Sequence, residues 1–103
     1  MKIVDLRSRF ANCNDELIEI SDSFIYCAEE KVHDGHPCIS VVEYSRTTNR
    51  ERVLSEWPLP AVACMQHYFS FADDIIAVME SGGSSVRVIR IDKHTGAERN
   101  STA

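Results

Sequence analysis

The sequence lacks three features that would assign it at once to a class of partner. It has no cluster or stripe of Lys and Arg, and its 103 residues carry a formal net charge of −5, which argues against binding to nucleic-acid phosphates. It has no apolar run near the roughly 20 residues that a membrane-spanning helix needs, and its N-terminus has no apolar segment typical of a secretory signal. We therefore expect a cytoplasmic protein with no nucleic-acid partner and no membrane partner.

Cysteine is present, but nothing in the sequence indicates an oxidising compartment. Cys13, Cys27, Cys38 and Cys64 are therefore expected to be free thiols, most of them buried. With 44% hydrophobic and 26% charged residues the composition is that of an ordinary globular domain. A single domain of this length buries a modest core, so a partner chain would add to its stability.

A duplicated pattern organises the chain. Residues 2–30 align with 53–81 at an offset of 51, and residues 39–52 align with 86–99 at an offset of 47. The identical pairs are Cys13 with Cys64, Asp22 with Asp73, Ile25 with Ile76, Glu29 with Glu80, Val41 with Val88, Thr48 with Thr95, Glu51 with Glu98 and Arg52 with Arg99. The apolar runs and the turns also stay in step, which predicts two repeats within one unit, about 1–51 and 52–103.

Each repeat has the pattern of β-strands. The short runs 16–20 and 67–71 are rich in apolar and β-favouring residues, and the continuously apolar runs 24–28 and 75–79 predict strands buried on both faces. The remaining predicted strands are 39–44, 86–91 and the more polar edge strand 52–57, whose counterpart one repeat earlier is 2–6. A helix over 71–82 is a competing interpretation, but the aligned segment 20–31 favours a strand.

Four-stranded units of this length, with a central strand that is apolar on both faces, resemble β-propeller blades. The segment 88–98 is similar to the third strand, turn and fourth-strand start of many propellers, and its D-x-x-T-G-x-E form is similar to quinoprotein-type blades. No WD dipeptide is present, and the one double glycine is not in a kelch context, so the resemblance is to the blade and not to one subfamily. The predicted fold is all-β, with two four-stranded antiparallel blade-like repeats.

Two blades do not close a propeller, because propellers usually have 4 to 8 blades. In the predicted order (outer strand first, then inner, second and third strands, repeated once) the chain begins with an outer strand and lacks one at its end. Strand exchange would let the N-terminal strand complete the second blade of a neighbouring copy; its residues are Lys2, Ile3, Val4, Asp5 and Leu6. A head-to-tail ring of three or four copies follows. A piece of a longer propeller, trapped as a dimer or with an unpaired edge, and a duplicated sheet domain of another kind are the alternatives.

The segment 29–38 concentrates the residues capable of chemistry. It makes the hairpin between the second and third strands four residues longer in the first repeat than in the second, and the resemblance implies that this hairpin opens on a face where ligands bind. His33, Asp34 and His36 are candidate ligand-binding residues there, and His33, His36 and Cys38 have donor types that zinc accepts. The alternative is a polar turn that Gly35 bends and Pro37 ends. A Cys38–His36 nucleophile lacks any visible orienting residue.

Trp57 is the other candidate binding residue, either as a stacking platform for a sugar or peptide or as packing against the blade. Its aligned position in the other repeat is Leu6, which weakens the sugar-binding interpretation. The function we predict is a non-enzymatic binding or scaffold module that needs no cofactor and associates with itself, with another protein or a small ligand as further partners. The alternatives are a carbohydrate- or small-ligand-binding protein that uses its rim loops, and a metal-binding or hydrolytic protein centred on residues 33–38.

Overall fold

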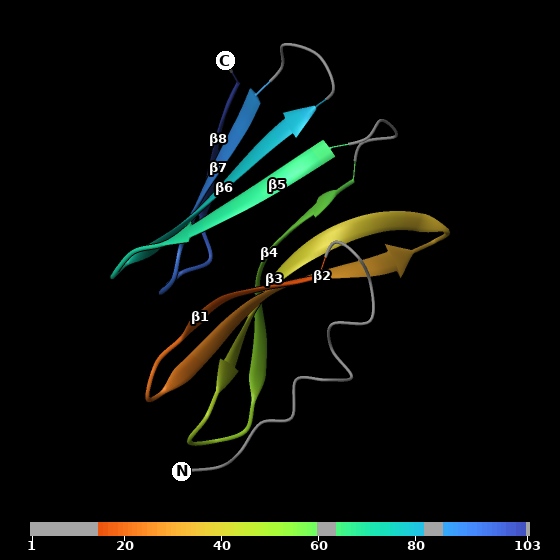
Figure 1. Cartoon of the computed structure of the whole chain (residues 1–103). Coiled ribbons are helices and arrows are strands. Elements are labelled where there is room, and N and C mark those ends of the chain that lie inside the picture. Colours follow the sequence, from red (N-terminus) through yellow and green to blue (C-terminus); the bar gives the residue numbers. More distant parts are fainter. Residues whose placement is uncertain (1–14, 60–63, 82–85, 103) are drawn as a thin grey trace.

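The computed structural model describes residues 15–59, 64–81 and 86–102. These residues form strands joined by turns, and none of them is in a helix. Two antiparallel sheets of four strands each make up this part of the chain (Figure 1). The strands are β1 (Glu16–Ile20), β2 (Phe24–His33), β3 (His36–Ser45) and β4 (Glu51–Pro58) in the first sheet, and β5 (Cys64–Ser70), β6 (Asp74–Ser81), β7 (Val86–Asp92) and β8 (Glu98–Thr102) in the second. The prediction of an all-β chain with two four-stranded antiparallel sheets is therefore confirmed.

The β6 segment settles the competition between strand and helix over residues 71–82. It pairs with β5 on one side and β7 on the other, so its backbone is satisfied by its neighbours across the sheet. Its β-branched and apolar residues alternate between a buried face toward the core and a half-buried outward face, an arrangement that such residues favour. No helix long and apolar enough to cross a membrane occurs in the described part of the chain.

The last strand corrects the predicted strand order. β8 pairs with β7 from Ile91↔Glu98 to Arg87↔Thr102, so the second sheet takes its fourth strand from its own chain. The short polar sequence after the second turn has no apolar residue that would indicate a strand, and only the ladder along β7 makes it one. The edge that residues 2–6 of a neighbouring copy were expected to fill is occupied, and residues 2–6 themselves lie outside the described residues.

Corresponding positions of the two sheets follow from matching backbone hydrogen bonds at their turns. Ser21 N donates to Phe24 O (2.8 Å) in the first sheet, as Phe71 N donates to Asp74 O (2.7 Å) in the second. Arg46 N likewise donates to Ser23 O (2.8 Å), and Lys93 N donates to Asp73 O (2.9 Å). These bonds relate β2 to β6 at an offset of 50, and the turns after β3 and β7 at an offset of 47.

The offset of 51 predicted for β2 and β6 is therefore too large by one residue, and a β-bulge is the reason. The register of β1 against β2 shifts between Leu17 and Glu19, so Ile18 is an extra residue in that strand. Residues before the bulge keep the predicted offset and residues after it do not. Ile25 consequently corresponds to Ile75 in the structure, and not to Ile76.

One core joins the two sheets, which form separate layers in Figure 1. Between the layers β1 contacts β5, and β4 contacts β7. The first sheet contributes Tyr26, Ala28, Ile39, Val41, Leu54 and Trp57, and the second contributes Ile75, Ala77, Met79, Ile89 and Ile91. Because side chains alternate along a strand, each sheet offers only every second residue to this core. The sheets are thus packed face to face, and their opposite faces point away from each other.

The two outward faces differ in their exposure. On the first sheet Ile25, Cys27, Val42 and Tyr44 form a second cluster, each at most 5% exposed. On the second sheet the outward residues Ile76, Val78 and Val88 are half-buried and Phe69 is 53% exposed. We call the group Phe69, Ile76, Val78 and Val88 the open face. It is flanked by the ion pairs Asp74–Arg90 (2.6 Å) and His67–Glu80 (3.6 Å).

Candidate functional site

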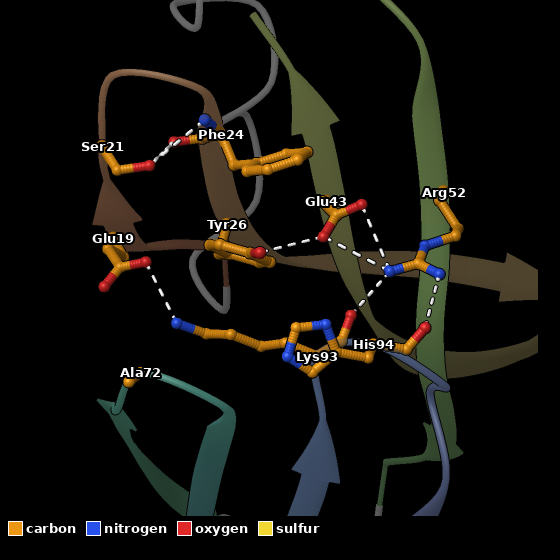
Figure 2. A pocket seen from close by; sticks show the side chains of 9 residues that line it. All are labelled: Glu19, Ser21, Phe24, Tyr26, Glu43, Arg52, Ala72, Lys93 and His94. Atoms are coloured by element: carbon orange, nitrogen blue, oxygen red, sulfur yellow. Dashed lines mark hydrogen bonds and ion pairs between the residues drawn. The ribbon is translucent and has the colours of Figure 1, made fainter.

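A pocket of about 600 Å³ lies where the two sheets meet. Figure 2 shows its lining, which comes from all four strands and the β1–β2 turn of the first sheet and from two turns of the second; the residues are Glu19, Ser21, Phe24, Tyr26, Glu43, Arg52, Ala72, Lys93 and His94. None of these residues was among the predicted binding or metal-ligand candidates. Their convergence depends on how the sheets pack, which no short motif in the chain encodes.

Arg52 connects the sheets on one side of this pocket. Its guanidinium lies 3.3 Å from a carboxylate oxygen of Glu43, and it donates to the main-chain carbonyls of Lys93 (2.6 Å) and His94 (3.0 Å). Tyr26 donates its hydroxyl hydrogen to the same Glu43 carboxylate (2.9 Å). Burial raises the pKa of the Tyr26 hydroxyl, and the negative charge of Glu43 at the end of that hydrogen bond raises it further.

Lys93 connects the sheets on the other side, although it is only 6% exposed. Its ammonium group lies 3.2 Å from Glu19 Oε2 and 4.7 Å from the centre of the Tyr26 ring (Figure 2). It also donates to the main-chain carbonyl of Phe71. A carboxylate, a carbonyl and an aromatic face together replace the water that a buried ammonium group loses. Both cations of the pocket are thus neutralised by carboxylates within it. The geometry is that of a clamp between the sheets rather than of a site with an uncommitted charge.

The hairpin between β2 and β3 is a tight turn on two long arms. Asp34 (φ 51°) and Gly35 (φ 78°) occupy the two central positions, and the ladder begins at His33↔His36. Two consecutive left-handed residues match the twist of the flanking strands, which is why this turn closes a two-residue loop. By the structural correspondence of Glu30 with Glu80 and of Ile39 with Val86, the first hairpin is three residues longer than the second, and not four. The extra residues lengthen the paired arms of the hairpin, and its turn has only two central residues.

A mixed cluster of metal-ligand types lies at the base of this hairpin. His33, Cys38 and Glu56 place ligand atoms within 4.8 Å of one another, with His33 Nε2 at 3.2 Å from Glu56 Oε2. The three residues come from β2, β3 and β4 and lie on the outward face of the first sheet. Ser40, directly opposite Glu56, donates its hydroxyl hydrogen to the same carboxylate oxygen. The described part of the chain contains one such group of at least three ligand types.

The two acids of this cluster have pKa values displaced in opposite directions. The hydrogen bond from Ser40 lowers the pKa of Glu56 and His33 lowers it further, while partial burial opposes both. Burial raises the pKa of the Cys38 thiol, and the neighbouring Glu56 carboxylate adds to that effect. With no ion bound, the cluster therefore holds an ionised carboxylate beside a neutral thiol.

The structure brings together two of the three predicted metal-ligand candidates. His33 and Cys38 lie in the cluster, whereas His36 lies opposite His33 at the turn and is not a member of it. Glu56 was missed, because it is 18 residues away from Cys38 in sequence and only the pairing of β3 with β4 brings it close. Cys27 and Cys38 are buried thiols outside any disulfide of the described residues, as predicted; Cys13 and the side chain of Cys64 lie outside what the structure describes.

Two further candidates have a structural role in this chain. Asp34 is the first left-handed residue of the turn, so it belongs to the bend and not to the cluster. Trp57 is 2% exposed within the core between the sheets, and its ring offers no exposed face for stacking. The packing alternative for Trp57 therefore describes its environment.

Compared with known proteins, the chain matches no family model, no curated protein sequence and no solved structure.

Proposed function

We propose that the protein is a non-enzymatic binding and scaffold module of the propeller type, which associates head to tail with copies of itself. The observation that carries this proposal is the relation between the core and the open face. Tyr26, Ala28 and Val41 of the first sheet pack against the second sheet, and their corresponding residues in the second sheet are Ile76, Val78 and Val88. Three of the four residues of the open face thus correspond to residues that already pack against a sheet.

The way the two sheets pack on each other supports a second copy of the chain as the partner of the open face. The face that the second sheet turns to the core includes Ile75, Ala77, Ile89 and Ile91, and these correspond to Ile25, Cys27, Val42 and Tyr44 on the outward face of the first sheet. Within one chain, the face of the first sheet that corresponds to the open face therefore packs on the face of the second sheet that corresponds to the outward face of the first. Repeating that contact between chains would join the open face of one copy to the first sheet of the next, and such head-to-tail contacts form a ring when the rotation between copies closes.

The outward face of the first sheet, on which the next copy would dock, sets a condition on this assembly. Ile25, Cys27, Val42 and Tyr44 are at most 5% exposed in the single chain, so docking there requires that their cover be displaced. The gain is the burial of the open face, where Phe69 alone is 53% exposed. Propellers usually have 4 to 8 blades, so three or four copies of a two-sheet chain would close a ring of six or eight.

The native mass in solution tests the proposal. Light scattering at several concentrations should give the mass of three or four chains, and Val88→Asp should give a monomer, because an aspartate would be desolvated at the centre of the contact. Circular dichroism should show that this variant keeps its strands, since Val88 points away from the core. Val32→Asp is the matched control: Val32 is 67% exposed on the β2 arm, outside the open face, and this variant should assemble as the unmodified chain does. A monomeric or dimeric unmodified chain overturns the ring.

Deleting residues 1–6 separates packing of faces from strand exchange. If the open face drives assembly, the shortened chain should retain the mass of the intact one, because Phe69, Ile76, Val78 and Val88 are untouched. If exchange of residues 2–6 drives it, the shortened chain should be a monomer. If the shortened chain is a monomer while Val88→Asp still assembles, strand exchange and not packing of the open face drives assembly.

A further inference from the structure

We propose that His33, Cys38 and Glu56 bind one divalent transition-metal ion, with zinc as the best fit, at the base of the β2–β3 hairpin. The three side chains supply a ring nitrogen, a sulfur and a carboxylate oxygen, which are the three donor types that zinc accepts in proteins. Magnesium and calcium prefer sites built from oxygen alone, so a thiol and an imidazole select against them. This inference does not depend on the proposed assembly.

The distances require only a small closure of the cluster. Metal–ligand bonds of zinc imply about 3.3 Å between a nitrogen and an oxygen ligand, and about 3.6 Å from sulfur to either, in a tetrahedral site. His33 Nε2 and Glu56 Oε2 are 3.2 Å apart, and all three ligand atoms lie within 4.8 Å of one another. The thiol and the other two ligands thus need to approach by about 1 Å, which is within the reach of side-chain rotation.

The backbone gives the cluster a rigid frame. Three adjacent strands position the ligands, and Ile39 and Val41, which alternate with Cys38 and Ser40 along β3, are fully buried. Ser40 donates to Glu56 Oε2 and so orients the carboxylate from behind, as groups next to metal ligands commonly do. The Cys38 thiol is buried while His33 is 59% and Glu56 37% exposed at the side chain, so an ion can enter from the solvent side.

The ligand charges of the cluster balance a divalent cation, but one neighbouring positive charge opposes its binding. A thiolate and a carboxylate neutralise the two charges of the ion, and binding releases the thiol proton to solvent. Lys31 lies directly opposite Cys38 on the same face, and its ammonium group is 3.8 Å from Glu29. A positive charge at this position opposes a cation, so replacing Lys31 by Met should tighten binding severalfold.

Titration of the full, chelator-treated chain with zinc tests the site. Isothermal calorimetry should show one equivalent bound, and zinc should raise the melting temperature. His33→Ala and Glu56→Gln should each weaken binding at least about tenfold, a loss that a tuning residue alone already produces at metal sites. Both residues are exposed at the side chain, so these variants are expected to fold. Unchanged affinity in His33→Ala overturns the proposal.

Matched controls come from the same chain. His67 lies 3.6 Å from Glu80 in the second sheet, outside any group of three ligand types in the described residues, so His67→Ala should bind zinc as the unmodified chain does. His36→Ala should also bind normally, because His36 is next to the cluster and outside it. Weakening by either control as large as that by His33→Ala would show that the three residues are not the site.

Cobalt provides a readout that identifies the sulfur ligand. Cobalt bound to the unmodified chain should give a thiolate-to-metal charge-transfer band, which Cys38→Ser should lose. A band that persists in Cys38→Ser would place the ion on another cysteine and overturn the proposal. Because Cys38 is 7% exposed and its replacement can disturb folding, the His33→Ala titration tests the site independently.

Discussion

The two sheets share their strand order and their turn hydrogen bonds, yet they differ in how many of their faces are covered. The first sheet has apolar side chains buried on both faces, and the second has them fully buried only on the face toward the first. Equivalent backbones thus support unequal surfaces, because the side chains and their surroundings decide exposure. Under the proposed assembly the uncovered face, and not the shared strand pattern, provides the contact, so experiments should compare corresponding positions of the two sheets.

Arg46 and Lys93 offer the sharpest such comparison. They occupy corresponding places after the third strand of each sheet, and the side chain of each donates to a main-chain carbonyl in the turn after its first strand, Ser21 for Arg46 (2.6 Å) and Phe71 for Lys93. Arg46 is half-buried at the end of the first sheet, whereas Lys93 is enclosed between the sheets. The same contact therefore has two environments.

Replacing these two residues by Met should give the largest difference. Lys93→Met should lower the free energy of unfolding by about 2 to 3 kcal/mol, because it leaves the Glu19 carboxylate and the Phe71 carbonyl without their buried partner. Arg46→Met should cost about 1 kcal/mol or less, since solvent reaches its surroundings. Urea denaturation at one protein concentration measures both. Equal losses would show that burial between the sheets does not distinguish the two positions.

Exchanging the turn residues Asn49 and Gly96 should have a smaller but equally unequal effect. Both have positive φ, 60° and 75°, a backbone conformation that glycine and asparagine adopt more readily than other residues, so the two positions differ in the space around them rather than in backbone conformation. A Cβ at Gly96 would lie 2.8 Å from the main-chain oxygen of Leu54, so Gly96→Asn should cost about 1 to 2 kcal/mol. Asn49→Gly should change stability by less than about 0.5 kcal/mol. Thermal unfolding compares the two variants. Equal melting temperatures would contradict the close approach of the second turn to β4.

The smallest expected effect distinguishes Glu56 from Glu80. The pKa of Glu56 is lowered in the folded chain by hydrogen bonds from Ser40 and His33. Between the lowered value and the ordinary 4.5, the unfolded chain binds more protons, so this stabilisation is complete above about pH 4.5 and is lost as the pH falls. Because the Glu56 side chain is 37% exposed, the loss should stay below about 1 kcal/mol.

Urea midpoints at pH 7 and pH 3 measure this effect. Glu56→Gln should reduce the drop in stability between the two pH values, because glutamine does not titrate. Glu80→Gln, which changes the exposed carboxylate paired with His67, should leave the drop nearly as it is in the unmodified chain. An equal reduction by both variants would mean that the bonds from Ser40 and His33 do not set the acid response.

Apolar patterning predicted most of the strands, because continuous runs such as residues 24–28 have few alternatives to a sheet covered on both faces. It failed where pairing, and not composition, decides the structure. The polar segment Glu98–Thr102 becomes a strand only because β7 has a free edge beside it. The extra residue at Ile18 shifted the predicted alignment, because a bulge leaves no mark in the composition of a strand.

The candidate site residues also divide into those that local sequence predicted and those that only strand pairing or sheet packing brings together. His33 and Cys38 were predictable because both lie within one hairpin, where residues close in sequence are close in space. Glu56 was not, since the pairing of Ser40 with Glu56 depends on the bulge between β3 and β4 at Val41 and Val42. The pocket between the sheets was unpredictable for a stronger reason: Glu19 and Lys93 are 74 residues apart, and only the packing of the layers joins them.

The difference between a covered and an open outward face has a consequence for growth. Subunits that join through two unlike faces polymerise without limit unless the chain of contacts closes on itself. In the proposed assembly every addition must first uncover Ile25, Cys27, Val42 and Tyr44, so a free end waits for a rare event before it can extend. The contact that closes a ring must uncover the same residues, so the cover slows closure and further addition alike. The covered face would thus limit how fast copies join, while the rotation between neighbouring copies decides between a ring and a fibre.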